Sequence, residues 1–135
     1  MRISATMPST YQRYLTLAAI LAGLAVALGA FAAHILKPLL EPRLLAAFIT
    51  GSEYQMTHAL GLLATAWIGQ YHPKNVWFVR AMRCFVAGIL LFSGSLYMLS
   101  LTGVNQLGMI TPLGGICIIS AWSCLALAFY TNSKH

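Results

Sequence analysis

Carboxylates are almost absent from this chain. Glu41 and Glu53 are the only acidic residues among 135, and charged residues make up 7% of the sequence. About a quarter of the residues of a soluble domain are charged. Hydrophobic residues account for 59% of the chain. The composition therefore excludes an ordinary soluble domain and predicts an integral membrane protein whose main partner is the lipid bilayer.

Sequence motifs for catalysis, nucleotide binding and metal binding are also missing. Gly114-Gly115 has no P-loop lysine after it, and Ser93-Gly94-Ser95 has no charged base beside it. The three cysteines lie in apolar runs without a C-x-x-C pair. Two histidines and a carboxylate are the kinds of residue that bind a metal or a haem, but the H-E-x-x-H spacing is absent. We expect no enzyme activity, no metal and no cofactor.

Four apolar runs are present, each long enough for a membrane span of about 20 residues. They cover approximately residues 14–36, 51–71, 80–101 and 109–130. Prolines 38, 42 and 73 and the turn at 102–106 separate them. The second helix is expected to begin near Pro42, with its first turns in the interface. The predicted fold class is all-α: residues 1–135 form a single transmembrane domain, an antiparallel four-helix bundle.

The cations predict how this bundle is oriented. The net charge is +6, but the basic residues are spread over the ends of apolar runs, which argues against a nucleic-acid partner. Lys37 and Arg43 lie on one side of the membrane, and six lie on the other. The positive-inside rule then places both termini in the cytoplasm. The six are Arg2, Arg13, Lys74, Arg80, Arg83 and Lys134.

A cleaved secretory signal ending at Ala30-Phe31-Ala32 is the alternative for the first run. Its apolar stretch exceeds the 7 to 15 residues of a signal core, which favours a membrane span.

Small residues predict where the helices pack. Lipid-embedded helices associate by close contact at glycine and alanine. The first span has two such faces, one along Ala18, Ala22, Ala25, Gly29 and Ala32 and one along Gly23, Ala27 and Ala30, so neighbours are expected on both sides. The predicted packing positions are Ala22, Ala25, Gly29, Gly94, Gly114 and Gly115.

Polar residues on the second span follow one helical face. Glu53, Tyr54, Thr57 and His58 fall within an arc of roughly 140° at 100° per residue, and the opposite side is apolar and is expected to meet lipid. Gln55 lies off the arc and is expected to form a hydrogen bond between helices. The topology brings polar residues of the other spans to the same outer half. The predicted polar intramembrane cluster is His34, Glu53, Tyr54, Gln55, Thr57, His58, Ser93, Ser95, Tyr97 and Thr111.

Two functions remain open for this cluster. In the first, the protein is a small non-enzymatic membrane protein, and the cluster serves packing, lipid-headgroup binding or docking in a homo-oligomer or a larger membrane complex. Glu53 then pairs with His34, Tyr97 or a helix end and fixes how two spans dock. In the second, Glu53, His58 and His34 form the pathway of a proton-coupled transporter or channel component, because intramembrane Glu and His residues recur in proton relays.

Four sequence blocks, one on each span, form a recognisable pattern. They are Leu28-Gly29-Ala30-Phe31-Ala32-Ala33-His34, Thr50-Gly51-Ser52-Glu53-Tyr54-Gln55 with His58-Ala59-Leu60, Leu91-Phe92-Ser93-Gly94-Ser95-Leu96-Tyr97, and Thr111-Pro112-Leu113-Gly114-Gly115 with Ala121-Trp122. With these blocks the chain resembles the YgdD/YwdK family of small bacterial inner-membrane proteins, which has eukaryotic transmembrane relatives. The resemblance implies a multi-pass protein of the inner membrane with four spans and no established activity. It also implies that Tyr54, Gln55, His58 and His34 are more central than Glu53. Ala32 departs from the family pattern, which usually has a second glycine there.

Overall fold

Four long helices make up most of the described part of the protein. The computed structural model describes residues 6–133, and no strand occurs in that range. The helices are α1 (Ser9–Phe31), α2 (Pro42–Gly69), α3 (Val76–Thr102) and α4 (Thr111–Asn132). A π-helical turn, η1 (Ala32–Leu36), extends α1, and a short 3-10 helix, η2 (Asn105–Met109), precedes α4. The prediction of an all-helical fold is confirmed.

The helix ends follow local sequence signals. Pro42 lies in the first turn of α2, where its missing N–H has no intrahelical partner to lose. The Asn75 side chain accepts a hydrogen bond from the backbone N–H of Trp77 and caps α3. Gly103 ends α3 with a φ of 70°, a conformation that glycine adopts without strain. The breaks in the helices lie where the proline and glycine pattern predicts them.

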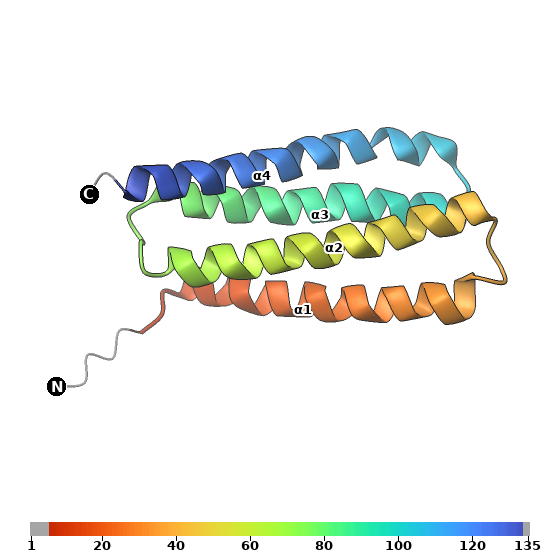
Figure 1. The fold of residues 1–135 in the computed structure, drawn as a ribbon, viewed down its shortest axis with the longest axis horizontal. Coiled ribbons are helices and arrows are strands. Elements are labelled where there is room, and N and C mark those ends of the chain that lie inside the picture. Colours follow the sequence, from red (N-terminus) through yellow and green to blue (C-terminus); the bar gives the residue numbers. More distant parts are fainter. Residues whose placement is uncertain (1–5, 134–135) are drawn as a thin grey trace.

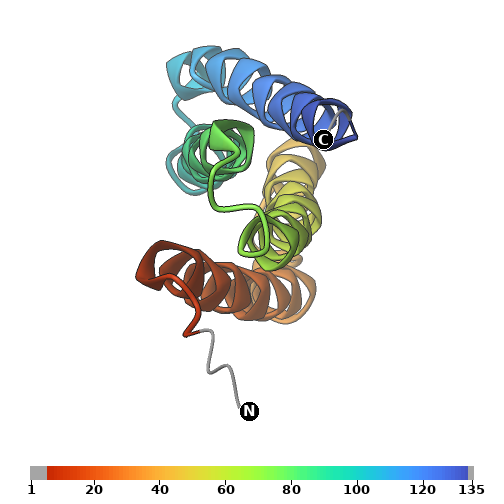
Figure 2. The ribbon, with the colours of Figure 1, turned by 90° about the vertical axis from the view of Figure 1, so that its left-hand side faces the viewer.

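Neighbouring helices in the chain are also neighbours in space. Figure 1 shows them running alternately in opposite directions, so that α1 begins and α4 ends at the same end of the bundle. In the end-on view of Figure 2, α2 and α3 lie between α1 and α4. Phe85 of α3 lies in the main core, where it meets the Trp122 ring at 5.0 Å between ring centroids.

The outer surface of the bundle is largely apolar. Large hydrophobic side chains such as Ile20, Leu90 and Ile119 are more than half exposed. Three segments are long and apolar enough to cross a membrane: Ser9–Leu36, Val76–Thr102 and Asn105–Asn132. The helix outside this set is α2, which carries most of the predicted polar cluster.

One small-residue face of α1 is buried, and the other is not. Ala18, Ala25 and Ala32 are buried along a seven-residue spacing, and Ala22 and Gly29 are half-buried beside them. The residues of the second face, Gly23, Ala27 and Ala30, are exposed. The expectation of a neighbour on both sides is therefore wrong within the described chain, where α1 packs on one side only.

Glycines mark the helix crossings, but only some of those predicted. A Cβ atom on Gly114 would lie 2.7 Å from the Phe92 Cα atom, so α3 and α4 touch backbone to backbone there. A Cβ atom on Gly94 or Gly115 would meet nothing within 4 Å. The prediction of close packing at these two glycines is wrong, because each lies beside the contact rather than in it. The glycines that the sequence missed are Gly51, Gly61, Gly69 and Gly88.

Candidate functional site

Gln55 joins three helices in the half of the bundle that holds the α1–α2 and α3–α4 connections. Its Nε2 donates to the backbone carbonyl of Leu21 on α1 at 2.8 Å. Its Oε1 accepts from the Tyr97 hydroxyl of α3 at 2.7 Å. The side chain is 4% exposed, so both bonds are shielded from water and are strengthened by the low local dielectric. The prediction that Gln55 makes an interhelical hydrogen bond is confirmed.

Two serines of α3 make further interhelical polar contacts in this half. Ser93 is buried, and its hydroxyl donates to the backbone carbonyl of Gly51 on α2 at 2.7 Å. Ser95 and Thr111 share a hydrogen bond of 2.6 Å between their hydroxyl oxygens, which joins α3 to the start of α4. The structure therefore brings five predicted residues into contacts that link all four helices: Gln55, Tyr97, Ser93, Ser95 and Thr111.

His58 is buried among aromatic rings. Its Nδ1 lies 2.7 Å from the Tyr54 carbonyl oxygen, one turn back on the same helix. Its ring centroid lies 6.0 Å from that of Trp122 on α4. Tyr54 is 42% exposed and stacks on Phe92 at 4.3 Å. These two residues contribute packing between helices.

Glu53, Thr57 and His34 point away from the bundle. All three are exposed. The Thr57 hydroxyl donates only to the Glu53 backbone carbonyl, at 3.0 Å. Within the described residues the Glu53 carboxylate makes no ion pair, so the expected pairing with His34 or Tyr97 is not found. The polar arc thus divides, with His58 on the buried side of α2 and Glu53 on the outer side.

The reason for this division is the rotation of α2 about its axis. Ile49, Leu60 and Trp67 lie on the apolar side that was expected to meet lipid, and they do lie outward. Buried positions on α2 centre on Gln55, Ala59 and Leu62, so the true inner face is turned by more than about 100° from the centre of the polar arc. The helical period gives the angle between two residues around the axis of α2. It does not give the rotation of α2 relative to its neighbours, and this rotation decides which of the two residues is buried.

Glu53 lies close to the middle of α2. Because α2 runs continuously from Pro42 to Gly69, Glu53 is about 4 Å from the midpoint of the helix at 1.5 Å per residue. The helices of the bundle are antiparallel and of similar length (Figure 1), so Glu53 also lies near the middle of the bundle and not at one end.

The described chain offers no metal site. No group of three or more His, Cys, Asp or Glu side chains comes together among residues 6–133. His58, His34 and Glu53 also form no connected chain, because His58 bonds to its own helix and the other two point outward.

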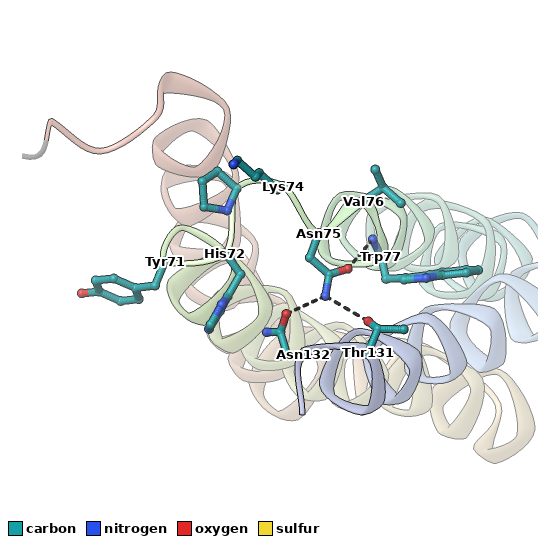
Figure 3. Close-up of a pocket in the computed structure, with 9 residues that line it drawn as sticks. Tyr71, His72, Lys74, Asn75, Val76, Trp77, Thr131 and Asn132 are labelled. Atoms are coloured by element: carbon teal, nitrogen blue, oxygen red, sulfur yellow. Dashed lines mark hydrogen bonds between the residues drawn. The ribbon is translucent and has the colours of Figure 1, made fainter. Parts of the chain in front are cut away.

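A second polar site, missed by the sequence reading, lies at the opposite end of the bundle. The Asn75 Nδ2 atom donates to the Ala128 carbonyl at 3.0 Å, to the Thr131 hydroxyl at 3.1 Å and to the Asn132 side-chain oxygen at 2.9 Å. Figure 3 shows Asn75, Thr131 and Asn132 around one pocket. Its volume is ≈ 550 Å³, and it lies between the α2–α3 turn and the last turn of α4. The signal available in the sequence was an asparagine just before an apolar helix, which is typical of an N-cap.

Comparison with known proteins assigns the family. The profile of the family described as "Protein of unknown function (DUF423)" matches residues 28–115. The chain belongs to this family. It is 44% identical to UPF0382 membrane protein YwdK of Bacillus subtilis over 85% of this chain and 94% of that protein. It is 45% identical to a UPF0382 membrane protein of Haemophilus influenzae over 90% and 97% of the two chains.

A third relative gives the same picture. UPF0382 inner membrane protein YgdD of Escherichia coli is 35% identical over 82% of this chain and 84% of its own length. No solved structure matches the chain. The resemblance to the YgdD/YwdK family is confirmed, and the chain is an integral membrane protein of a family without an established activity.

Proposed function

We propose that this protein is a small, non-enzymatic, four-span component of the bacterial inner membrane that docks on a helix of another membrane protein through the outer face of α2. We define the α2 outer face by its exposed residues Ile49, Glu53, Thr57, Leu60 and Ala64. Both termini are proposed to lie in the cytoplasm, as the distribution of cations favours.

The length and neighbours of α2 support a fourth span. Its 28 residues match α1 with η1, which together form a 28-residue candidate span. It packs along α1 on one side and α3 on the other, and Figure 1 shows it running the length of the bundle. A helix that packs between two membrane-spanning helices, and that runs antiparallel to both, is expected to cross the same thickness of membrane.

The observation that carries the docking proposal is the position of Glu53. A lone carboxylate facing lipid near the bilayer centre costs about 2.5 kcal/mol or more, and intramembrane ionisable residues normally face a protein interior or a partner. Glu53 is exposed, has no ion pair with any of residues 6–133 and lies on a face that is otherwise apolar or hydroxylic. A second polypeptide over this face would remove the carboxylate from lipid.

Charge complementarity indicates what covers the face. Glu53 requires a basic or hydrogen-bond-donating side chain at its own depth. The described cations of this chain lie near helix ends, and Arg43 is already 3.4 Å from the Asn105 side-chain oxygen. In a two-fold dimer with its axis normal to the membrane, each residue keeps its depth, so a second copy brings no cation to Glu53. We therefore assign the α2 outer face to a different membrane protein whose helix carries a lysine, arginine or histidine there.

Native gel electrophoresis of mildly solubilised membranes tests this proposal. We expect the wild type to migrate in a complex, Glu53→Ala to migrate as the free protein, and Glu53→Gln to retain part of the complex through its amide. Ser123→Ala is the matched control, because Ser123 is an exposed residue of α4 that bonds only within its own helix. Free wild-type protein, a complex of this chain alone, or a complex insensitive to Glu53→Ala would each contradict the proposal.

A further inference from the structure

The pocket beside Asn75 has walls that hydrogen bonds and ring stacking hold in place. Two hydrogen-bond donors at the pocket have no partner among the described residues. Asn75 joins the start of α3 to the end of α4 through its amide, and its Oδ1 accepts from the backbone N–H of Trp77 at 3.1 Å. His72 is stacked on Phe78 with 5.8 Å between ring centroids. These contacts hold the α2–α3 turn in one arrangement, so the pocket is already formed before anything binds in it.

Two hydrogen-bond donors at the pocket remain unused. Lys74 is exposed, and no described acceptor pairs with its ammonium group. Asn132 accepts from Asn75 through its side-chain oxygen. In Figure 3 its amide nitrogen points away from Asn75, toward His72. A lysine ammonium and a side-chain amide are groups that bind phosphate oxygens.

The surroundings of the pocket are cationic and lack acids. Arg80 lies over the Trp77 ring, with 4.6 Å from its guanidinium carbon to the ring centroid. The two carboxylates of the chain are elsewhere, since Glu41 precedes α2 at the other end of the bundle and Glu53 is near its middle. Within residues 6–133, this end of the bundle therefore attracts anions and offers them no competing side-chain carboxylate. Its described cations are Arg13, Lys74, Arg80 and Arg83.

Aromatic residues indicate the depth of the pocket. Tyr71 and Trp77 line it, and Tyr and Trp are enriched where a membrane protein crosses the headgroup region. The volume of ≈ 550 Å³ lies within the range of small-molecule sites, about 300 to 1,000 Å³. Basic pockets between helices on the cytoplasmic side bind anionic headgroups.

We propose that this pocket binds the phosphate-bearing headgroup of an anionic phospholipid. Lys74 supplies the charge, the Asn132 amide donates a hydrogen bond to a phosphate oxygen, and Trp77 packs against the glycerol region. This site is independent of the α2 outer face, because it lies at one end of the bundle and Glu53 lies near the middle.

Lipid retention by the purified full chain tests the site. The protein in phosphatidylcholine micelles is titrated with phosphatidylglycerol, and native mass spectrometry counts the lipid retained. We expect the wild type to bind phosphatidylglycerol about tenfold more tightly than phosphatidylcholine, and Lys74→Ala to lose about fivefold of that preference, as expected for one cation near a headgroup. Lys74→Arg should preserve it. Lys37→Ala, which removes an exposed lysine at the other end of the bundle, should change it less than twofold.

A second variant keeps the proposal testable. Asn132→Asp retains the oxygen that accepts from Asn75 while replacing the free donor by a negative charge, so it should weaken phosphatidylglycerol binding at least as much as Lys74→Ala. Equal binding of the two lipids by the wild type, or equal losses in Lys74→Ala and Lys37→Ala, would overturn the proposal. Inorganic phosphate and glycerol phosphate form the soluble arm. Binding of either as tightly as the lipid would overturn the assignment to a lipid.

Discussion

At the scale of single residues, the buried Tyr11 and the half-buried Tyr97 differ in their hydrogen bonds. The Tyr97 hydroxyl donates to Gln55 at 2.7 Å. Tyr11 is 3% exposed, and its hydroxyl has no hydrogen-bond partner within the described chain. A buried acceptor that loses its partner costs about 1 to 3 kcal/mol, and the same penalty disappears when an unpaired group is removed.

Replacement of each tyrosine by phenylalanine should therefore affect the stability of the protein differently at the two positions. We expect Tyr97→Phe to lower the free energy of unfolding by about 1 to 2 kcal/mol, because Gln55 Oε1 stays buried without a donor. We expect Tyr11→Phe to leave it unchanged or to raise it by about 1 kcal/mol. Thermal unfolding of both variants in one detergent checks this. Equal losses of stability in the two variants would show that the Tyr97–Gln55 hydrogen bond adds nothing to the free energy of unfolding.

At the scale of helices, Gly114 and Gly115 are neighbours in sequence with different surroundings. A methyl group on Gly114 would overlap the backbone of Phe92 and would have to separate α3 from α4, whereas one on Gly115 would meet nothing. We expect Gly114→Ala to destabilise the protein by about 1 to 3 kcal/mol, the typical cost of overpacking, and Gly115→Ala to be neutral. Denaturant unfolding of the pair measures the difference. A neutral Gly114→Ala would contradict the backbone contact.

Asn75 connects the α2–α3 turn to the end of α4, so removal of its side chain should affect both segments. Removal of an asparagine cap typically costs about 0.5 to 2 kcal/mol, and Asn75 additionally bonds three groups of α4. We expect Asn75→Ala to lower the free energy of unfolding by more than about 2 kcal/mol. Asn75→Asp keeps only the oxygen that caps α3, so its stability should lie between those of Asn75→Ala and the wild type. Hydrogen exchange should show the increased opening in the last turn of α4. Changes confined to α3 would contradict the link.

Helix type and helix ends were predictable from the sequence, but the rotation of α2 was not. Pro42 begins α2 and Gly103 ends α3 through their own backbone conformations, so these helix ends can be predicted from a few neighbouring residues. The side on which Glu53 lies depends on contacts such as Gly51 with Tyr97 and Gly61 with Phe85, which join residues far apart in the chain. The interhelical role of Gln55 was predicted from its position off the polar arc of the same helix. Asn75 was overlooked, although it carries a cap signal, because its α4 partners are more than 50 residues away.

At the scale of the whole molecule, the proposed four-span arrangement predicts which turns face the cytoplasm. After replacement of the three native cysteines by alanine, single cysteines are introduced as Lys37→Cys and Lys74→Cys, at exposed positions before and after α2. We expect a membrane-impermeant maleimide added outside intact spheroplasts to label the first variant and to label the second only after lysis. Labelling in the reverse order would invert the topology, and labelling of both from outside would exclude α2 as a span.

The central claim is that another membrane protein covers the α2 outer face at Glu53. A photo-crosslinking amino acid at position 57 tests it most directly, with position 116, an exposed site on α4, as the matched control. The account predicts one discrete adduct from position 57 in native membranes, of a mass that is not a multiple of this chain, absent from position 116 and lost in Glu53→Ala. Crosslinking only to lipid, an adduct of two copies of this chain, or an adduct that persists in Glu53→Ala would contradict it.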